Sequence, residues 1–120
     1  MKIITPKFHA ILDFVLIILL LASPNIFHLS DTASTLCYAL AVIHFLLTII
    51  TDFSGGIFKI VHLKLHGLIE LVVSILLVIL AFTFFKGNLV DEIYFACLGL
   101  LILIIFTLTD YQKAPPLITR

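Results

Sequence analysis

Charged residues are scarce in this chain. Lysine, arginine, aspartate and glutamate together make up 12% of its 120 residues, whereas 62% of the residues are hydrophobic. A soluble domain is about half apolar and roughly a quarter charged. Because small domains bury only part of their surface, so much apolar surface cannot be hidden from water in a chain of this length. The composition excludes an ordinary soluble domain and predicts a protein that has the lipid bilayer as its solvent.

The zero net charge, the small number of cysteines and the lack of common functional motifs exclude several classes of function. The formal net charge is zero, so no basic field suggests nucleic acid as a partner. The two cysteines, Cys37 and Cys97, are too few and too far apart for a disulfide framework or a zinc ribbon. The chain also lacks a phosphate-binding glycine loop, a nucleophile-elbow serine and a GxxxG dimer motif. No catalytic residue can be assigned, and both enzymatic activity and assembly into a homo-oligomer or a larger membrane complex stay open.

Four apolar runs cover residues 8–27, 34–51, 65–85 and 92–109. Each has about the 17–25 residues that a helix needs to cross the hydrocarbon core. Lipid cannot satisfy free backbone groups, so spanning segments of this kind must be helical. Turn-forming residues separate the runs, and candidate helix N-caps are Asp31 or Ser34 for the second run and Asp91 for the fourth. The sequence predicts an all-α, integral membrane four-helix bundle.

The positive residues are distributed unevenly between the two ends of these spans. Only Lys86 lies between the third and fourth runs, and the 23–33 loop has no lysine or arginine. Cytoplasmic loops carry an excess of lysine and arginine, so both termini and the middle loop are predicted to be cytoplasmic. Six positive residues support this orientation: Lys2, Lys7, Lys59, Lys64, Lys113 and Arg120.

The two halves of the chain resemble each other. Residues 7–13 (KFHAILD) match residues 64–70 (KLHGLIE) at a shift of 57, and 51–53 (TDF) match 109–111 (TDY) at a shift of 58. The matches indicate two tandem two-helix hairpins, one at about 5–53 and one at about 62–111. Since each hairpin crosses the membrane twice, the pseudo-two-fold axis between the copies is predicted to run along the membrane normal.

Several short segments resemble a known family. They are residues 5–9 (TPKFH), 12–14 (LDF), 21–27 (LASPNIF) and 51–53 (TDF). Together they are similar to the SPW-repeat proteins, which are small bacterial membrane proteins with two tandem two-helix repeats. Asn25 stands where the family has tryptophan, and residues 80–84 (LAFTF) of the second copy lack Ser-Pro. The resemblance implies this topology and the bacterial inner membrane, and it implies no particular activity.

Ionisable residues within the predicted spans are the most informative feature. At the centre of a span each costs roughly 2.5–3.5 kcal/mol on insertion, so such residues face the bundle interior and one another. Spacings of four put His9 with Asp13, and His66 with Glu70, on single helix faces. The sequence predicts a cluster in the cytoplasmic half that is drawn from eight residues: His9, Asp13, His44, Thr48, Asp52, His66, Glu70 and Asp110.

Three interpretations of this cluster stay open. The first is a site for a divalent metal, or for haem, because carboxylates and histidines from four helices resemble the ligands of di-metal bundles. The second is a proton relay through His44, Thr48 and Asp52. The third is a non-catalytic structural or accessory subunit, in which polar pairs only hold the helices together. We therefore predict a small polytopic protein whose cluster binds a cation or a proton, with metal ligands drawn from His9, Asp13, Asp52, His66, Glu70 and Asp110.

Overall fold

The structure, a computed structural model, describes residues 1–113 and consists of four long helices followed by one short turn of 3-10 helix. The elements are α1 (Pro6–Phe27), α2 (Asp31–Ile50), α3 (Leu63–Phe82), α4 (Leu89–Leu108) and η1 (Tyr111–Lys113). Each of the four long helices is long and apolar enough to cross a membrane. The all-α four-helix fold predicted from the sequence is confirmed, and Arg120 lies outside the described residues.

Short polar residues fix where the helices begin, although not always the expected ones. Ser30 caps α2 by accepting a hydrogen bond from the Ala33 N–H at 3.2 Å, so the expected caps Asp31 and Ser34 are wrong. Asn88 caps α4, and Asp91 lies inside the first turn. Neighbouring residues of this kind are all good caps, so the sequence alone does not choose among them.

Asp91 has a different role, since it connects the two hairpins at the end where α1 joins α2. Its carboxylate accepts hydrogen bonds from the Ser30 N–H at 3.1 Å and from the Ser30 hydroxyl at 2.5 Å. The side chain is only 1% exposed. A buried carboxylate needs such donors, so this contact ties the start of α4 to the start of α2.

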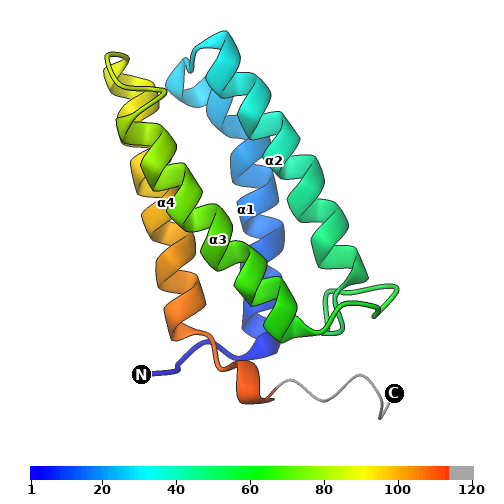
Figure 1. Cartoon of the computed structure of the whole chain (residues 1–120). Coiled ribbons are helices and arrows are strands. Elements are labelled where there is room, and N and C mark those ends of the chain that lie inside the picture. Colours follow the sequence, from blue (N-terminus) through cyan, green and yellow to red (C-terminus); the bar gives the residue numbers. More distant parts are fainter. Residues whose placement is uncertain (114–120) are drawn as a thin grey trace.

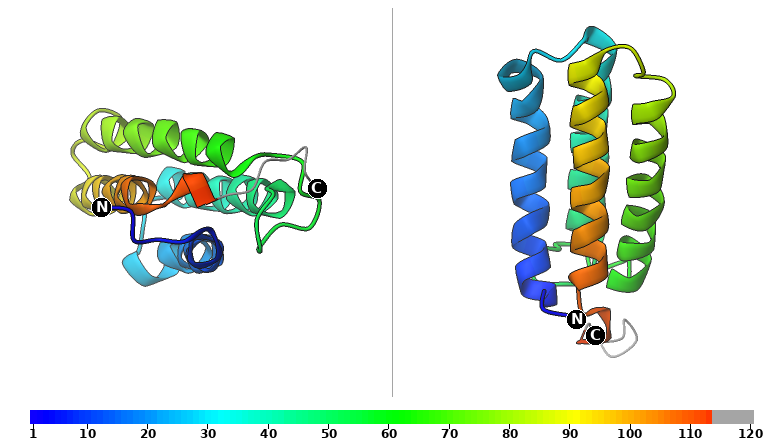
Figure 2. Two further views of the ribbon diagram at one scale, coloured as in Figure 1. Left: turned by 90° about the horizontal axis from the view of Figure 1, so that it is seen from below. Right: turned by 90° about the vertical axis from the view of Figure 1, so that its left-hand side faces the viewer.

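The helices pair as two hairpins. α1 packs along α2, and α3 packs along α4. Figure 1 shows both hairpin turns at one end of the bundle, with the start of the chain, the α2–α3 connection and η1 at the other. The four helices run side by side in Figure 2. Large apolar side chains such as Ile18, Ile43, Ile75 and Ile104 point outward, as a lipid-facing surface requires.

The apolar core fills the half of the bundle nearest the hairpin turns. Small residues let the helices approach closely there, and Gly99 is the clearest case. A Cβ on Gly99 would lie 2.8 Å from the Ser74 carbonyl oxygen and 2.7 Å from the Val78 side chain. Small residues at such interfaces allow backbones to meet where the hydrophobic effect does not drive association. The core cluster is made of Leu16, Leu20, Leu29, Ala33, Cys37, Ala41, Leu77, Ala81, Phe85, Phe95, Leu98 and Ile102.

At the other end the hairpins interlock through matching backbone contacts. The Ile4 N–H donates to the Leu108 carbonyl at 2.9 Å, and the Val61 N–H donates to the Ile50 carbonyl at 2.9 Å. In return, the Asp110 N–H donates to Ile4 at 2.8 Å, and the Asp52 N–H donates to Val61 at 2.7 Å. The segment before each hairpin therefore pairs with the segment that ends the other hairpin, and the contacts of the two halves correspond.

Candidate metal centre

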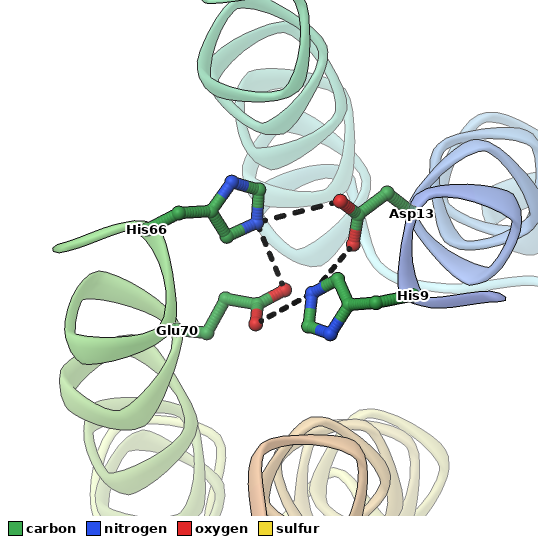
Figure 3. Close-up of side chains that lie close together, drawn as sticks. All are labelled: His9, Asp13, His66 and Glu70. Carbon is green, nitrogen blue, oxygen red and sulfur yellow. Dashed lines mark ion pairs between the residues drawn. The ribbon is translucent and has the colours of Figure 1, made fainter. Parts of the chain in front are cut away.

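Two histidines and two carboxylates meet between α1 and α3 (Figure 3). His9 and Asp13 come from α1, and His66 and Glu70 come from α3. None of the four is more than 4% exposed. In each pair the histidine and the acid are four residues apart, so both side chains extend from one helix face.

The four side chains form a ring in which histidine and carboxylate alternate. The His9 Nε2 atom lies 3.3 Å from Asp13 Oδ1 and 3.2 Å from Glu70 Oε2. The His66 Nε2 atom lies 3.4 Å from Asp13 Oδ2 and 3.4 Å from Glu70 Oε1. One ligand atom from each residue can be chosen so that all four lie within 4.8 Å of one another.

These separations suit a tetrahedral metal ion. Zinc binds imidazole nitrogen and carboxylate oxygen at about 2.0–2.2 Å, which places neighbouring ligand atoms of a tetrahedron about 3.4 Å apart. The four nitrogen–oxygen contacts of the ring, 3.2–3.4 Å, have about that length, although each carboxylate uses a different oxygen for each histidine. With one ligand atom from each residue the separations reach up to 4.8 Å, so an ion bound by all four residues would draw these atoms closer together.

The atoms that face the centre lack hydrogen-bond partners within the described chain. They are Nε2 of His9 and His66, Oδ2 of Asp13 and Oε2 of Glu70, and all four are buried. The nitrogen–oxygen distances are those of ion pairs, but the hydrogen-bond geometry is not satisfied. A buried polar atom without a hydrogen bond costs about 1–3 kcal/mol. Four such atoms around one point are well explained by a cation that satisfies them together.

Two threonines hold the outer nitrogens of the histidine rings. His9 Nδ1 lies 2.8 Å from Thr109 Oγ1, and His66 Nδ1 lies 2.8 Å from Thr51 Oγ1. Each hydroxyl also lies 2.6 Å from a carbonyl of its own helix. A hydroxyl has one hydrogen and a carbonyl only accepts, so each threonine donates to the carbonyl and accepts from Nδ1–H. In the neutral imidazole the lone pair of Nε2 then faces the ring, as in metal sites with an ordered outer shell.

These threonines were missed when the sequence was read for polar spacing within helices. The expected residue was Thr48, but its hydroxyl donates to the His44 carbonyl at 2.8 Å and belongs to the helix backbone. Thr51 and Thr109 instead bind the histidine of the other hairpin. Both stand in the repeated 51–53 and 109–111 segments, so the internal repeat was the signal that could have identified them.

His44 approaches the ring from α2. Its Nε2 atom lies 3.3 Å from Asp13 Oδ1 and 4.0 Å from Glu70 Oε1, and it too is buried without a hydrogen-bond partner. Its side chain is 12% exposed, more than any member of the ring. Five of the eight residues singled out in the sequence therefore come together, from three helices.

Asp52 and Asp110 lie outside the ring. Asp52 Oδ1 is 4.0 Å from Lys59 Nζ, and Asp110 Oδ2 is 3.9 Å from Lys113 Nζ. The physical reason is that α2 ends at Ile50 and α4 ends at Leu108. Beyond a helix end, a spacing of four no longer keeps two side chains on one face. Of the six residues predicted as ligands, four therefore form the ring and two lie outside it, with His44 beside the ring.

Two aromatic rings cover the histidines on the side of the termini. Phe53 lies 5.6 Å from His66 and 6.3 Å from His9, and Tyr111 lies 5.9 Å from His9, between ring centroids. Tyr111 packs onto Gly67, where a Cβ would be 2.5 Å from the tyrosine Cζ. Burial raises the pKa of Tyr111 and the Glu70 carboxylate raises it further, so this cover is a neutral phenol at physiological pH.

No family model matches this chain, and no curated protein or solved structure matches it either. The interpretation of the centre therefore rests on the geometry of its own residues. Membership of the SPW-repeat family stays a prediction from short motifs.

Proposed function

We propose that this protein is a small polytopic membrane protein that binds one divalent transition-metal ion in the ring of His9, Asp13, His66 and Glu70. One observation carries the proposal. Two buried imidazoles, each oriented by a threonine, direct Nε2 toward two carboxylates, and one ligand atom from each of the four residues lies within 4.8 Å of the others. Imidazole and carboxylate donors suit zinc, iron and manganese, whereas the absence of a cysteine from the ring disfavours copper(I).

The charge of the ring favours a divalent ion over a monovalent one. With neutral imidazoles, the Asp13 and Glu70 carboxylates give the ring a charge of two negative units. Burying an uncompensated charge within a membrane span has a high free-energy cost, and burying two carboxylates close together costs more still. One divalent cation balances both carboxylates. The carboxylates also occupy the space between the two Nε2 atoms, where a porphyrin plane would have to lie, so a metal ion fits better than haem.

A purely structural cluster is the second candidate, because the His9–Asp13 and His66–Glu70 pairs exist within their helices. Such a cluster should satisfy its polar atoms through hydrogen bonds, since that is how polar residues stabilise helix packing in membranes. Here the inward-facing atoms have no such partner within the described chain. This observation favours the metal over the accessory subunit.

We also propose that the chain is a bacterial inner-membrane protein of the SPW-repeat type with both termini in the cytoplasm. Lys2 lies in the segment before α1 and Lys59 in the α2–α3 connection, and Lys7 and Lys64 lie in the first turns of α1 and α3, directly after these segments. Both segments lie at the same end of the bundle (Figure 1). The positive-inside rule assigns that end to the cytoplasm, and the recurring contacts of the two hairpins support the two-repeat organisation. The metal would then lie in the cytoplasmic half.

Elemental analysis of the full chain, purified in detergent without chelators and then supplied with Zn²⁺, tests the proposal. We expect one ion per chain. Asp13→Asn and Glu70→Gln should each lower affinity by more than the roughly 10–100-fold typical of outer-shell changes. Asp110→Asn is the matched control, because this carboxylate lies at the same end but outside the ring. Circular dichroism and gel filtration verify folding.

Two results would overturn the proposal. One is a folded wild-type chain that takes up no zinc, iron or manganese. The other is an Asp110→Asn variant that loses as much metal as Asp13→Asn, since the ring would then have no special role.

A further inference from the structure

His44 breaks the symmetry of the centre. The ring and its outer shell consist of corresponding pairs from the two hairpins, His9 with His66, Asp13 with Glu70, and Thr51 with Thr109. At the shift of 58 residues that relates the two threonines, His44 corresponds to Ile102. The second hairpin therefore has an apolar residue where the first has an imidazole. An interaction that needs His44 can occur on one side of the ring only.

A small cavity lies on that side. It has a volume of about 40 Å³ and is lined by His44, Glu70, and apolar residues of α2, α3 and α4, including Val73 and Ile102. A cavity needs about 10–15 Å³ on this measure to hold one water. The space is thus enough for a ligand of two or three heavy atoms and too small for an organic substrate of ordinary size.

Two of the residues that line this cavity have buried polar atoms without hydrogen-bond partners. Glu70 is 4% exposed, and its Oε2 atom has no hydrogen-bond partner within the described chain. The same holds for His44 Nε2, which lies near both carboxylates of the ring. An apolar cavity would stay dry, but one bordered by a carboxylate and an imidazole has groups that can hold a small polar molecule. His44 is placed to contact a molecule that also reaches the ion.

We propose that the metal ion keeps one coordination position open toward this cavity, and that water or a small anion of two or three heavy atoms binds there against His44. The inference rests on the proposed metal site and extends it. Structural zinc sites are closed by four protein ligands, whereas reactive sites admit a water or substrate and can expand to five ligands. The ring supplies four protein ligands, so this molecule is the fifth ligand of the ion, and His44 hydrogen bonds to its outer atom.

Cobalt(II) and azide provide the test. Cobalt takes the place of zinc, its visible absorption reports coordination, and azide is a linear anion of three atoms. We expect azide to change the spectrum of the cobalt-loaded wild-type chain saturably. His44→Ile installs the residue of the corresponding position, and Val73→Phe fills the cavity. Both should still bind one cobalt per chain but require at least about tenfold more azide. Leu46→Phe, on the outward face of α2, is the control and should respond like the wild type.

The outcomes separate the two proposals. A wild-type chain that binds no cobalt or zinc overturns the metal site, and this inference with it. A chain that binds cobalt but whose spectrum azide leaves unchanged overturns this inference alone. So does a His44→Ile variant that binds azide as tightly as the wild type. If Val73→Phe does not fold, the His44→Ile comparison still decides.

Discussion

Thr109→Val removes a hydroxyl without changing the size of the side chain and so tests the orientation of His9. In the wild type, Thr109 Oγ1 accepts the Nδ1–H of His9 at 2.8 Å. Valine cannot accept it, and the N–H remains buried because both residues are 0% exposed. The unpaired Nδ1–H favours rotation of the imidazole or a change of tautomer. Either change would remove the Nε2 lone pair from the ring.

The substitution should lower both the stability of the fold and the affinity for the metal. Leaving the buried Nδ1–H unpaired should cost about 1–3 kcal/mol of unfolding free energy. Losing an outer-shell partner should weaken metal binding about 10–100-fold, which corresponds to roughly 1.4–2.7 kcal/mol. Thr51→Val should lower stability and metal affinity by similar amounts, because the hydrogen bond between Thr51 and His66 has the same length of 2.8 Å. Similar losses from two residues 58 apart would be a direct consequence of the symmetric centre.

Competition for Zn²⁺ against a chromophoric chelator measures the affinity, and denaturant unfolding in detergent measures stability. Thr109→Ser keeps the hydroxyl and should recover most of the metal affinity. Thr107→Val is the control, since Thr107 is exposed two residues away, its hydroxyl donates to the Ile104 carbonyl, and its bond to Lys2 uses only the backbone carbonyl. The reasoning is refuted if Thr109→Val binds Zn²⁺ as tightly as Thr107→Val does.

Two further predictions concern stability. Gly67→Ala should lower the unfolding temperature despite the helix propensity of alanine, worth about 1 kcal/mol, because the new Cβ would lie 2.5 Å from Tyr111 Cζ. In a Tyr111→Ala background the same change should be neutral or stabilising, and a loss there would contradict the steric reason. Asp91→Ala should cost about 1–3 kcal/mol in the same unfolding assay because it removes both acceptors of Ser30. Its Zn²⁺ affinity should stay unchanged, and a loss of metal would show that the two ends of the bundle are coupled.

Much of the fold could be predicted because a bilayer restricts what a chain can do. Long apolar runs must become helices there, and the four helices overlap the four runs with ends that differ by up to three residues. The periodicity of a helix likewise places His9 with Asp13, and His66 with Glu70, on common faces before any tertiary contact is known. Adjacent caps such as Ser30 and Asp31 could not be distinguished, because both side chains can accept the same backbone hydrogen bond.

The composition and the spacing of a few residues thus determined that this protein is a four-helix membrane-type bundle with polar faces on its helices. Only the tertiary structure decided which polar faces meet. The packing between hairpins brings the α1 and α3 pairs into one ring, adds His44 from α2, and directs Thr51 and Thr109 to the histidines of the opposite hairpins. It also leaves Asp52 and Asp110 outside, beyond the ends of their helices. Helical periodicity fixes a side chain relative to its own helix, whereas the rotation and depth of each helix are set by contacts with its neighbours.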